Sequence, residues 1–347
     1  MRKTGGIAIL IRVLTGGFFL AVFIVALYYL SILLSVKSPH GINQARALYA
    51  QPENSIDVVF LGSSHIHYGV NTAYLWKEHG VAAYDYSSAE QPLWMTYYWI
   101  REFLKTQHPR LIVIDLFSPA SFTEDFQYDF PGENIYGLNL SRNKIEAISD
   151  MIERNRYEEY LPEFFAVHSR YGDLKEEDFL AISDPGRLVN FKGFTPYIEY
   201  AHWDLNEPSQ DQAIGYTPKQ SKFLEKIYEL SLEEEIPLFF MVIPYAGVTP
   251  QEEMFYNRSQ QIFLEAGVPC PNYNHFYESI GLDPEVDLYD ESHLSYTGSI
   301  KFTEYLYRDL SSYVELPDRR GQEGYESWDV NADIIDRYTK GETKLLY

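Results

Sequence analysis

A run of 24 uncharged residues near the N-terminus, residues 13–36, constrains this chain of 347 residues more than any other feature. At about 1.5 Å per residue such a run measures roughly 36 Å as a helix, enough to cross a bilayer with some tilt. Arg2, Lys3 and Arg12 precede the run, and no acidic residue does. The positive-inside rule therefore predicts a cytoplasmic N-terminus (residues 1–12), a transmembrane helix (13–36) and an extracytoplasmic remainder.

A cleaved signal peptide is the alternative interpretation of this run. The run is longer than the apolar core of a signal peptide, and the sequence Leu33-Leu34-Ser35-Val36 is a poor small-residue cleavage site. We therefore expect a protein of the cell membrane that crosses it once and carries one external domain.

Charge and cysteine content exclude several classes of protein. The chain carries 28 basic and 50 acidic residues, a net charge of −22. Nucleic-acid binding needs a basic footprint, so we expect no nucleic-acid partner. Anionic lipid headgroups would repel so acidic a domain, which argues against a second attachment along the membrane surface. The single cysteine, Cys270, excludes an internal disulfide and every multi-cysteine metal motif.

Beyond a polar segment (37–55) predicted to be a linker, short apolar runs alternate with helical patterns. Because parallel strands need helical crossovers, this alternation predicts an α/β fold, a three-layer structure with a parallel sheet between two layers of helices. The expected strands are residues 56–61, 81–86, 111–116 and 238–243, and the expected helices are 92–106, 221–234, 252–266 and 297–314.

Two segments do not follow this alternation. Residues 120–215 are rich in Tyr, Phe, Glu and Asp, which indicates an insertion within a domain spanning 56–315, and we expect it to cap the ends of the strands. Residues 316–347 are polar and are interpreted as a C-terminal tail, either a wrapping arm or partly disordered.

The first motif with chemical potential is Gly62-Ser63-Ser64-His65, directly after the first expected strand. Reactive groups of open α/β sheets gather at the carboxyl ends of strands, and main-chain N–H groups of a following helix can face an oxyanion. An ordinary strand-to-helix turn capped by serine is the simpler interpretation of this motif alone.

The second motif is Asp290-Glu291-Ser292-His293, just before the helix expected at 297–314. An aspartate and a histidine three residues apart on one turn can hydrogen-bond, so that the carboxylate fixes the imidazole tautomer and stabilises its protonated form. For this motif alone, a polar loop entering a helix is the simpler interpretation.

Together the two motifs resemble the SGNH/GDSL hydrolase superfamily, over residues 55–115 and 237–315. The resemblance implies an SGNH-hydrolase-like fold and a catalytic triad in which Ser64 is the nucleophile, His293 the general base and Asp290 its partner. Ser63 stands where that family commonly has aspartate. Gly62, Ala89, Glu90 and His65 are the expected oxyanion or substrate-binding residues, the donors being main-chain N–H groups.

The resemblance is incomplete in the middle of the chain. The segment after the second strand, residues 85–91, contains no glycine where the family has an oxyanion-hole glycine. The strand at 111–116 runs into Asp115-Leu116, without the family's asparagine. Losing one oxyanion donor typically costs on the order of 10²–10³ in rate, which puts the efficiency of hydrolysis in doubt.

The chain is similar to one subgroup of this superfamily in three respects: the membrane anchor, the sequence Gly62-Ser63-Ser64, and the departures from the family pattern in the middle of the chain. This subgroup contains the D-alanine transfer protein of teichoic-acid operons and the alginate O-acetylation proteins. The resemblance implies an O-acyltransferase that works through an acyl-serine, without a cofactor. Its acceptor would be an envelope polysaccharide or teichoic-acid-like polymer, its donor a carrier or lipid-linked ester, and its neighbour a multi-spanning membrane O-acyltransferase. An SGNH esterase of envelope glycans or lipids stays open, as does a non-catalytic scaffold or binding partner of such an acyltransferase.

Other patterns favour plainer interpretations, and we expect no metal. His65 and His67 are two apart, so in a helix they point to different faces. The acidic run between Asp283 and Asp290 lacks the glycine that a calcium loop needs for its turn. The 30 tyrosines are able to stack on sugar rings, but core and surface packing explain them equally well.

Overall fold

The computed structural model describes residues 3–161, 166–206 and 212–346. In it a four-stranded, wholly parallel sheet has the order β2-β1-β3-β4. The strands are β1 (Val58–Leu61), β2 (Ala83–Asp85), β3 (Leu111–Asp115) and β4 (Leu238–Met241). Each lies within a predicted strand and is one to three residues shorter than predicted, because only the central residues pair with a neighbour.

Helices make up most of the rest of the described chain. The longer ones are α1 (Lys3–Leu34), α4 (Thr72–His79), α5 (Leu93–Phe103), α8 (Arg142–Met151), α10 (Glu176–Ser183), α11 (Pro218–Glu233), α12 (Pro250–Ala266), α14 (Tyr296–Tyr313) and α15 (Glu326–Thr339). Shorter ones are α2 (Ile42–Leu48), α3 (Ser64–Gly69), α6 (Phe117–Ser121), α7 (Pro131–Ile135) and α13 (Tyr277–Ile280). Four 3₁₀ turns among the described residues are η1 (Arg154–Glu159), η2 (His168–Gly172), η3 (Pro185–Asn190) and η4 (Tyr273–Phe276).

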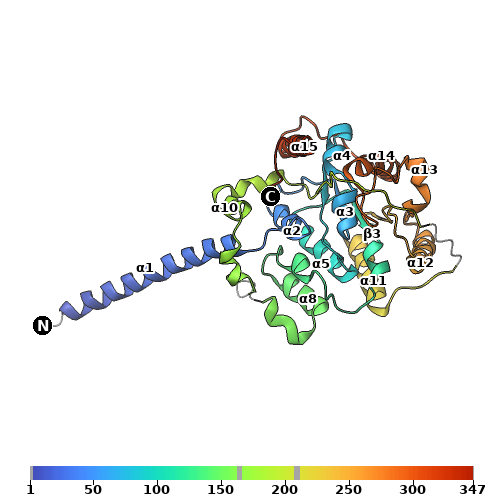
Figure 1. Ribbon diagram of the computed structural model, residues 1–347. Helices are drawn as coiled ribbons and strands as arrows, with labels where there is room; N and C mark the ends of the chain where they lie inside the picture. The colour runs from blue at the N-terminus through green and yellow to red at the C-terminus, as the bar shows by residue number, and fades with distance from the viewer. Residues whose placement is uncertain (1–2, 162–165, 207–211, 347) are drawn as a thin grey trace.

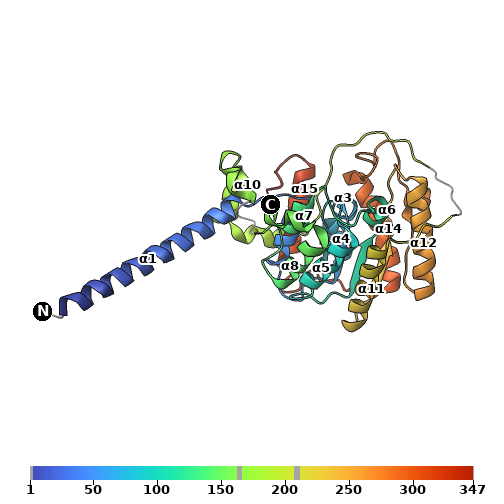
Figure 2. The ribbon, with the colours of Figure 1, turned by 90° about the horizontal axis from the view of Figure 1, so that it is seen from below.

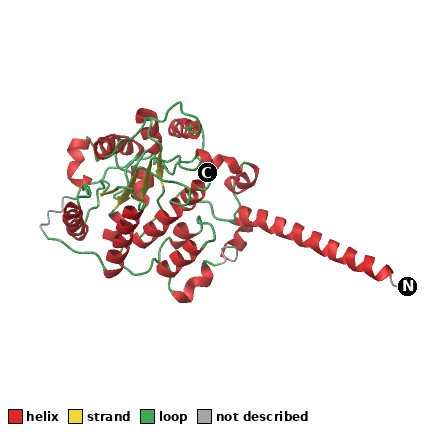
Figure 3. Cartoon of the chain, turned by 180° about the vertical axis from the view of Figure 1, so that it is seen from behind, coloured by secondary structure: helices red, strands yellow, loops and turns green. Residues whose placement is uncertain are grey.

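The sheet lies between two layers of helices, as the alternating sequence predicts (Figure 3). Alternate strand residues enter opposite cores, since successive side chains of a strand point to opposite faces. Val59 and Ile112 join a core with α5, α8, α11 and α12, whereas Val58 and Val113 join a second core with α3, α4 and α14. The predicted α/β class and parallel sheet are thereby confirmed.

Helix α1 extends away from this body as a single rod, and its far end carries the N-terminus (Figures 1 and 2). Residues 10–34 of it have a mean hydropathy of 2.5 and are almost entirely exposed. Helix α1 is therefore long and apolar enough to span a membrane.

The segment predicted to be a linker, residues 37–55, instead contains the buried helix α2. Ile42, Ala45 and Leu48 are buried and lie at helical spacing. Polar residues in this segment form hydrogen bonds within the protein. The Gln44 amide accepts from the Gly41 N–H at 2.9 Å and donates to the Gly193 carbonyl at 3.1 Å. Helix α1 is therefore joined to the body by packed structure.

The predicted insertion caps the strand ends only in part. α7 and α8 pack against α2 and α5, and α10 packs against α1. Described residues of the insertion reach the chain that follows β1 and β2: the Asn134 amide donates to the Ala89 carbonyl at 2.9 Å, the Asp85 N–H donates to the Lys192 carbonyl at 3.0 Å, and the Thr195 N–H donates to the His67 carbonyl at 2.7 Å.

The C-terminal tail, described to residue 346, packs on the domain as the wrapping-arm interpretation predicts. It forms α15, which packs against α4 and η3. Trp328, Asn331 and Ile335 are buried on one side of this helix. The indole N–H of Trp328 donates to the Ala83 carbonyl of edge strand β2 at 3.4 Å.

Candidate active site

A tight turn carries the chain from β1 into α3. Gly62 has a φ of 140°, and a Cβ there would lie 3.0 Å from the Cβ of Asp115. Only glycine adopts that φ readily. Because glycine also lacks a Cβ, the chain after β1 is able to lie close to Asp115 at the end of β3. Ser63 caps α3, since its buried hydroxyl accepts from the His65 N–H at 3.2 Å. Ser64, the first residue of α3, is thus fixed beside the carboxyl end of β1.

Asp115 supports this turn from the end of β3. The Ser63 hydroxyl donates to its carboxyl group at 3.4 Å, and the N–H groups of Phe117 and Ile243 donate to it at 3.2 Å each. Burial raises the pKa of Asp115 to about 7, against the opposing effect of these hydrogen bonds. The position where the family pattern has asparagine therefore stabilises the serine turn.

The second motif forms a loop closed by a bridge between Leu288 and Leu294. This loop brings the His293 Nε2 to 2.8 Å from the Ser64 Oγ. On its other side the His293 Nδ1 lies 3.0 Å from each carboxylate oxygen of Asp290. With Nδ1–H donating to the carboxylate, Nε2 is left to accept the serine proton. The three side chains predicted to act together are therefore in contact, in the order that proton transfer needs.

Main-chain groups hold the carboxylate of Asp290. The N–H groups of Ser292 and His293 both donate to its Oδ1 at 2.8 Å. Burial disfavours its charged form, but the hydrogen bond and charge of His293 and these two N–H groups outweigh burial and lower the pKa of Asp290. Asp290 is thus an ionised carboxylate held in place beside the His293 ring.

Aromatic rings surround His293. The rings of Tyr68, His65 and Tyr197 meet it edge-on, with centroids at 5.0, 5.4 and 6.0 Å. Tyr197 stacks on Tyr68 at 4.0 Å and on Tyr289 at 3.6 Å. These rings limit the access of water to the imidazole and restrict its rotation.

His65 was expected to touch substrate, and the structure buries it instead. Its ring stacks on Phe117 at 3.7 Å, and neither ring nitrogen has a hydrogen-bond partner among the described residues. Burial, followed by the charges of His293 and His67, lowers the pKa of His65 well below its ordinary value. His65 is therefore a neutral ring behind His293.

The Ala89 N–H was expected to bind an oxyanion, but it donates to the His40 carbonyl at 2.7 Å. His40 lies between α1 and α2 and packs on the loop after β2. Its carbonyl oxygen therefore occupies the Ala89 N–H, which is not available to an oxyanion. Within the described part of the chain, the N–H groups of Ser64 and Glu90 have no protein acceptor. Glu90 has a positive φ of 48°, and burial beside Asp129 and Glu124 raises the pKa of its side chain to about 7.

Two neighbours of the site were not singled out in the sequence. The His40 Nδ1 lies 2.6 Å from the Tyr68 hydroxyl. Tyr68 stands four residues after Ser64, one helical turn away, so the motif itself offers a signal for it. His40 gives no such signal, because its contacts are with residues far along the chain.

No group of three or more His, Cys, Asp or Glu residues in the described part of the chain is arranged to hold a metal ion. In the acidic run, Asp287 accepts from Lys301 and from the Asp283 N–H. His67 contacts the Ser87 hydroxyl, away from the ring environment of His65. Neither pattern gathers a ligand set.

Comparison of the sequence with protein-family models and with curated proteins finds no match. The case for function therefore rests on the geometry of Ser64, His293 and Asp290.

Proposed function

We propose that the protein is a membrane-anchored serine enzyme that transfers an acyl group from an ester donor to a hydroxyl group of a cell-envelope polymer. The observation that carries this proposal is the continuous chain of contacts from Ser64 through His293 to Asp290, at 2.8 and 3.0 Å. Such a chain activates a hydroxyl that is otherwise a weak nucleophile. The parallel sheet and the position of Ser64 after β1 also support the likeness to SGNH hydrolases.

The reaction begins when the Ser64 Oγ attacks the ester carbonyl and His293 Nε2 takes its proton. The N–H of Ser64 is available to the resulting oxyanion. The intermediate collapses as the donor alcohol departs with the proton from His293, and an acyl-serine ester remains. His293 then removes a proton from the acceptor hydroxyl, which attacks the acyl-serine and restores Ser64. Asp290 holds the imidazole ring and stabilises its cation throughout.

The proposed location is extracytoplasmic, with α1 in the membrane and the N-terminus in the cytoplasm. The three basic residues before the apolar run support this orientation. No acyl-CoA is present outside the cell, so the donor would be a carrier or a lipid-linked ester. A multi-spanning membrane O-acyltransferase is the proposed neighbour that supplies the acyl group, and an envelope polysaccharide or teichoic-acid-like polymer is the proposed acceptor.

A fluorophosphonate tests the activated serine directly. The Ser64 oxygen would form a bond to phosphorus as fluoride leaves, and intact mass would report the adduct. With the full chain in detergent, we expect labelling of the wild type and of Ser149→Ala, an exposed serine on α8. Labelling should be lost in Ser64→Ala and in His293→Ala. Absence of labelling in folded wild type would instead indicate a non-catalytic scaffold.

Transfer and hydrolysis are separated by adding acceptor. We expect an acyl-serine formed from an activated acetyl ester to decay faster when a soluble polysaccharide is present, with the acetyl group recovered on the sugar. Decay at the same rate with release of acetate alone would indicate an esterase. The occupied Ala89 N–H gives a physical reason to expect slow hydrolysis.

A further inference from the structure

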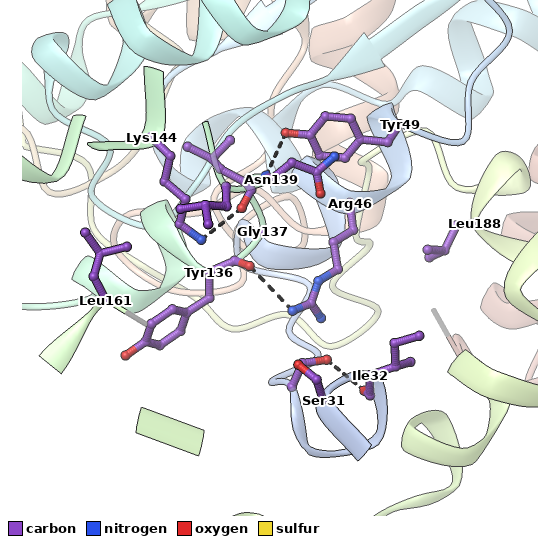
Figure 4. A pocket seen from close by; sticks show the side chains of 13 residues that line it. Ser31, Ile32, Arg46, Tyr49, Tyr136, Gly137, Asn139, Lys144, Leu161 and Leu188 are labelled. Atoms are coloured by element: carbon purple, nitrogen blue, oxygen red, sulfur yellow. Dashed lines mark hydrogen bonds between the residues drawn. The ribbon is translucent and has the colours of Figure 1, made fainter. Parts of the chain in front are cut away.

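The connection between α1 and α2, residues 35–41, borders two different parts of the molecule. The end of α1 and helix α2 form walls of a cavity of about 810 Å³, at the point where α1 joins the body (Figure 4). His40, which comes shortly before α2, contacts α3 and the loop after β2 instead. Because α3 begins with Ser64, the contacts of His40 bear on the candidate active site.

The main chain of His40 holds this residue beside the turn that carries Ser64. Its carbonyl oxygen accepts from the Ala89 N–H at 2.7 Å. One residue earlier in the same loop, the Ser88 N–H donates to the Gly62 carbonyl at 3.1 Å. The loop after β2 is therefore bonded both to His40 and to the turn between β1 and α3.

The imidazole ring of His40 lies on the same side of α3 as Ser64. His67 and Tyr68 stand three and four residues after Ser64, so the three side chains share one face of the helix. The centroid of the His40 ring is 6.0 Å from those of both His67 and Tyr68. Tyr68 in turn meets His293, whose Nε2 lies 2.8 Å from the Ser64 Oγ. The His40 ring is thus a neighbour of the reacting serine.

The hydrogen bond between His40 and Tyr68 decides which nitrogen of His40 carries its proton. Burial and then the charge of His293 lower the pKa of His40, so at neutral pH the ring is neutral and has one N–H. Burial raises the pKa of Tyr68, so its hydroxyl keeps its proton. Because an imidazole nitrogen is a stronger acceptor than a phenol oxygen, this hydroxyl donates to the His40 Nδ1 at 2.6 Å and accepts from Tyr197, its other hydrogen-bond partner. The N–H of His40 is therefore at Nε2.

This Nε2–H is unused within the protein. No described residue accepts from it. The ring is half-buried, and Nε2 is not among the nitrogens that are both fully buried and unpartnered, so a ligand can reach it. Histidine side chains are among the donors that stabilise oxyanions in enzymes. The residue whose carbonyl occupies the Ala89 N–H thus offers a second donor of its own.

We propose that His40 is a catalytic residue whose Nε2–H donates to the oxyanion formed when Ser64 attacks an ester. With the main-chain N–H of Ser64 it would supply two donors, which compensates in part for the occupied Ala89 N–H. His40 forms no covalent bond and loses no proton, since His293 alone carries the serine proton. Tyr68 is a positioning residue, because it selects the tautomer of His40. The inference rests on the proposed acyl transfer at Ser64.

The kinetics of fluorophosphonate labelling test this role, because the phosphoryl oxygen gains negative charge as Ser64 attacks. With the full chain in detergent, the rate constant at saturation reports the chemical step and the half-saturating concentration reports binding. We expect His40→Ala to lower the rate constant about 10²-fold, as loss of one oxyanion donor does, at an unchanged half-saturating concentration. His108→Ala, the same substitution at an exposed histidine, should label like the wild type.

Two conservative variants separate hydrogen-bond donation from packing. The amide nitrogen of glutamine is able to replace Nε2, so His40→Gln should regain about tenfold of the rate lost in His40→Ala. The main-chain bond to Ala89 is kept in both variants, and circular dichroism should show both folded. Tyr68→Phe keeps the ring that meets His293 but no longer selects the tautomer of His40, so it should slow labelling about tenfold.

The outcomes distinguish this inference from the proposed function. Labelling of His40→Ala at the wild-type rate, or of His40→Gln as slowly as His40→Ala, would overturn the role of His40 and leave the serine enzyme intact. A change confined to the half-saturating concentration would also overturn it, because His40 would then bind the reagent without stabilising the oxyanion. A folded wild type that is not labelled would contradict both proposals.

Discussion

The main-chain N–H of Ala89 donates to the carbonyl oxygen of His40 at 2.7 Å, so the segment that follows α1 is bonded to the loop beside the candidate active site. The same His40 contacts Tyr68, whose ring meets His293. The candidate site is therefore built partly from the segment between α1 and α2, and it depends on how that segment packs.

Gly41, next to His40, packs closely against Ser88 in the loop after β2 and against the Glu133 carbonyl. It has a φ of 147°, and a Cβ there would lie 2.2 Å from the Ser88 hydroxyl and 2.7 Å from the Glu133 carbonyl. We expect Gly41→Ala to displace the loop at residues 87–90 and to slow fluorophosphonate labelling of Ser64 by about tenfold or more, as loss of positioning typically does. Labelling rates measure the effect. Gly172→Ala, where a Cβ meets nothing within 4 Å, is the control and should label like the wild type.

Asp290→Asn should leave the chain folded and slow labelling of Ser64 by roughly 10³–10⁴-fold, because an amide does not select the reactive tautomer of His293. Exposed Glu291→Gln, one residue away, should label normally. Because the pKa of Asp290 is lowered in the folded protein, its contribution to stability is present above its ordinary pKa and is lost as pH falls through the folded value. Urea unfolding between pH 6 and 3 should therefore show a smaller loss for Asp290→Asn than for wild type, and an identical loss would contradict this role.

The raised pKa of Asp115 predicts that the free energy of unfolding depends on pH in the opposite direction. Its pKa is raised to about 7 in the folded protein, so between about pH 4 and pH 7 the unfolded chain has lost a proton that the folded chain keeps. Stability should therefore fall as pH rises through this window, by an amount on the order of a few kcal/mol from this group. Denaturant titrations at a series of pH values measure the slope. Asp115→Asn removes the titration, and an unchanged slope in that variant would show that Asp115 ionises normally.

The sequence predicts the sheet and the pairing of Asp290 with His293 because both depend on local patterns. Residues 111–115 are an apolar run that forms a buried strand, and Asp290 and His293 are close enough along the chain to meet in one loop. Contact between His293 and Ser64, which are 229 residues apart, was expected only from the resemblance to SGNH hydrolases.

What the sequence did not predict depends on contacts between distant residues. The bond from Ala89 to His40 spans 49 residues, and no local pattern records it. Helix α2 looked like a linker because Asn43 and Gln44 are polar, although hydrogen bonds with nearby Ser38 and with distant Gly193 let both be buried. Helix α15 is different: Trp328, Asn331 and Ile335 fall at helical spacing, so a signal was present in the tail and was obscured by its polar composition.

Trp328 gives the sharpest test of whether that tail belongs to the folded domain. Its side chain is fully buried, and it stacks near Trp76 of α4 with ring centroids 6.0 Å apart. The ammonium of buried Lys192 lies 3.5 Å from the centre of its ring. Removing the indole would leave a cavity and take away the aromatic face against which that ammonium is placed.

Trp328→Ala should therefore lower the free energy of unfolding by about 3–5 kcal/mol, the usual range for a large aromatic residue in a core. Val330→Ala, at a position on the same helix that is 42% exposed, should change it by less than about 0.5 kcal/mol. Denaturant unfolding of the full chain in detergent, followed by tryptophan fluorescence and circular dichroism, measures both variants. Because α15 contacts edge strand β2 through Trp328, the loss should appear in unfolding of the whole domain and not in a separate transition of the tail. A Trp328→Ala variant as stable as Val330→Ala would mean that the tail rests on the domain without stabilising it.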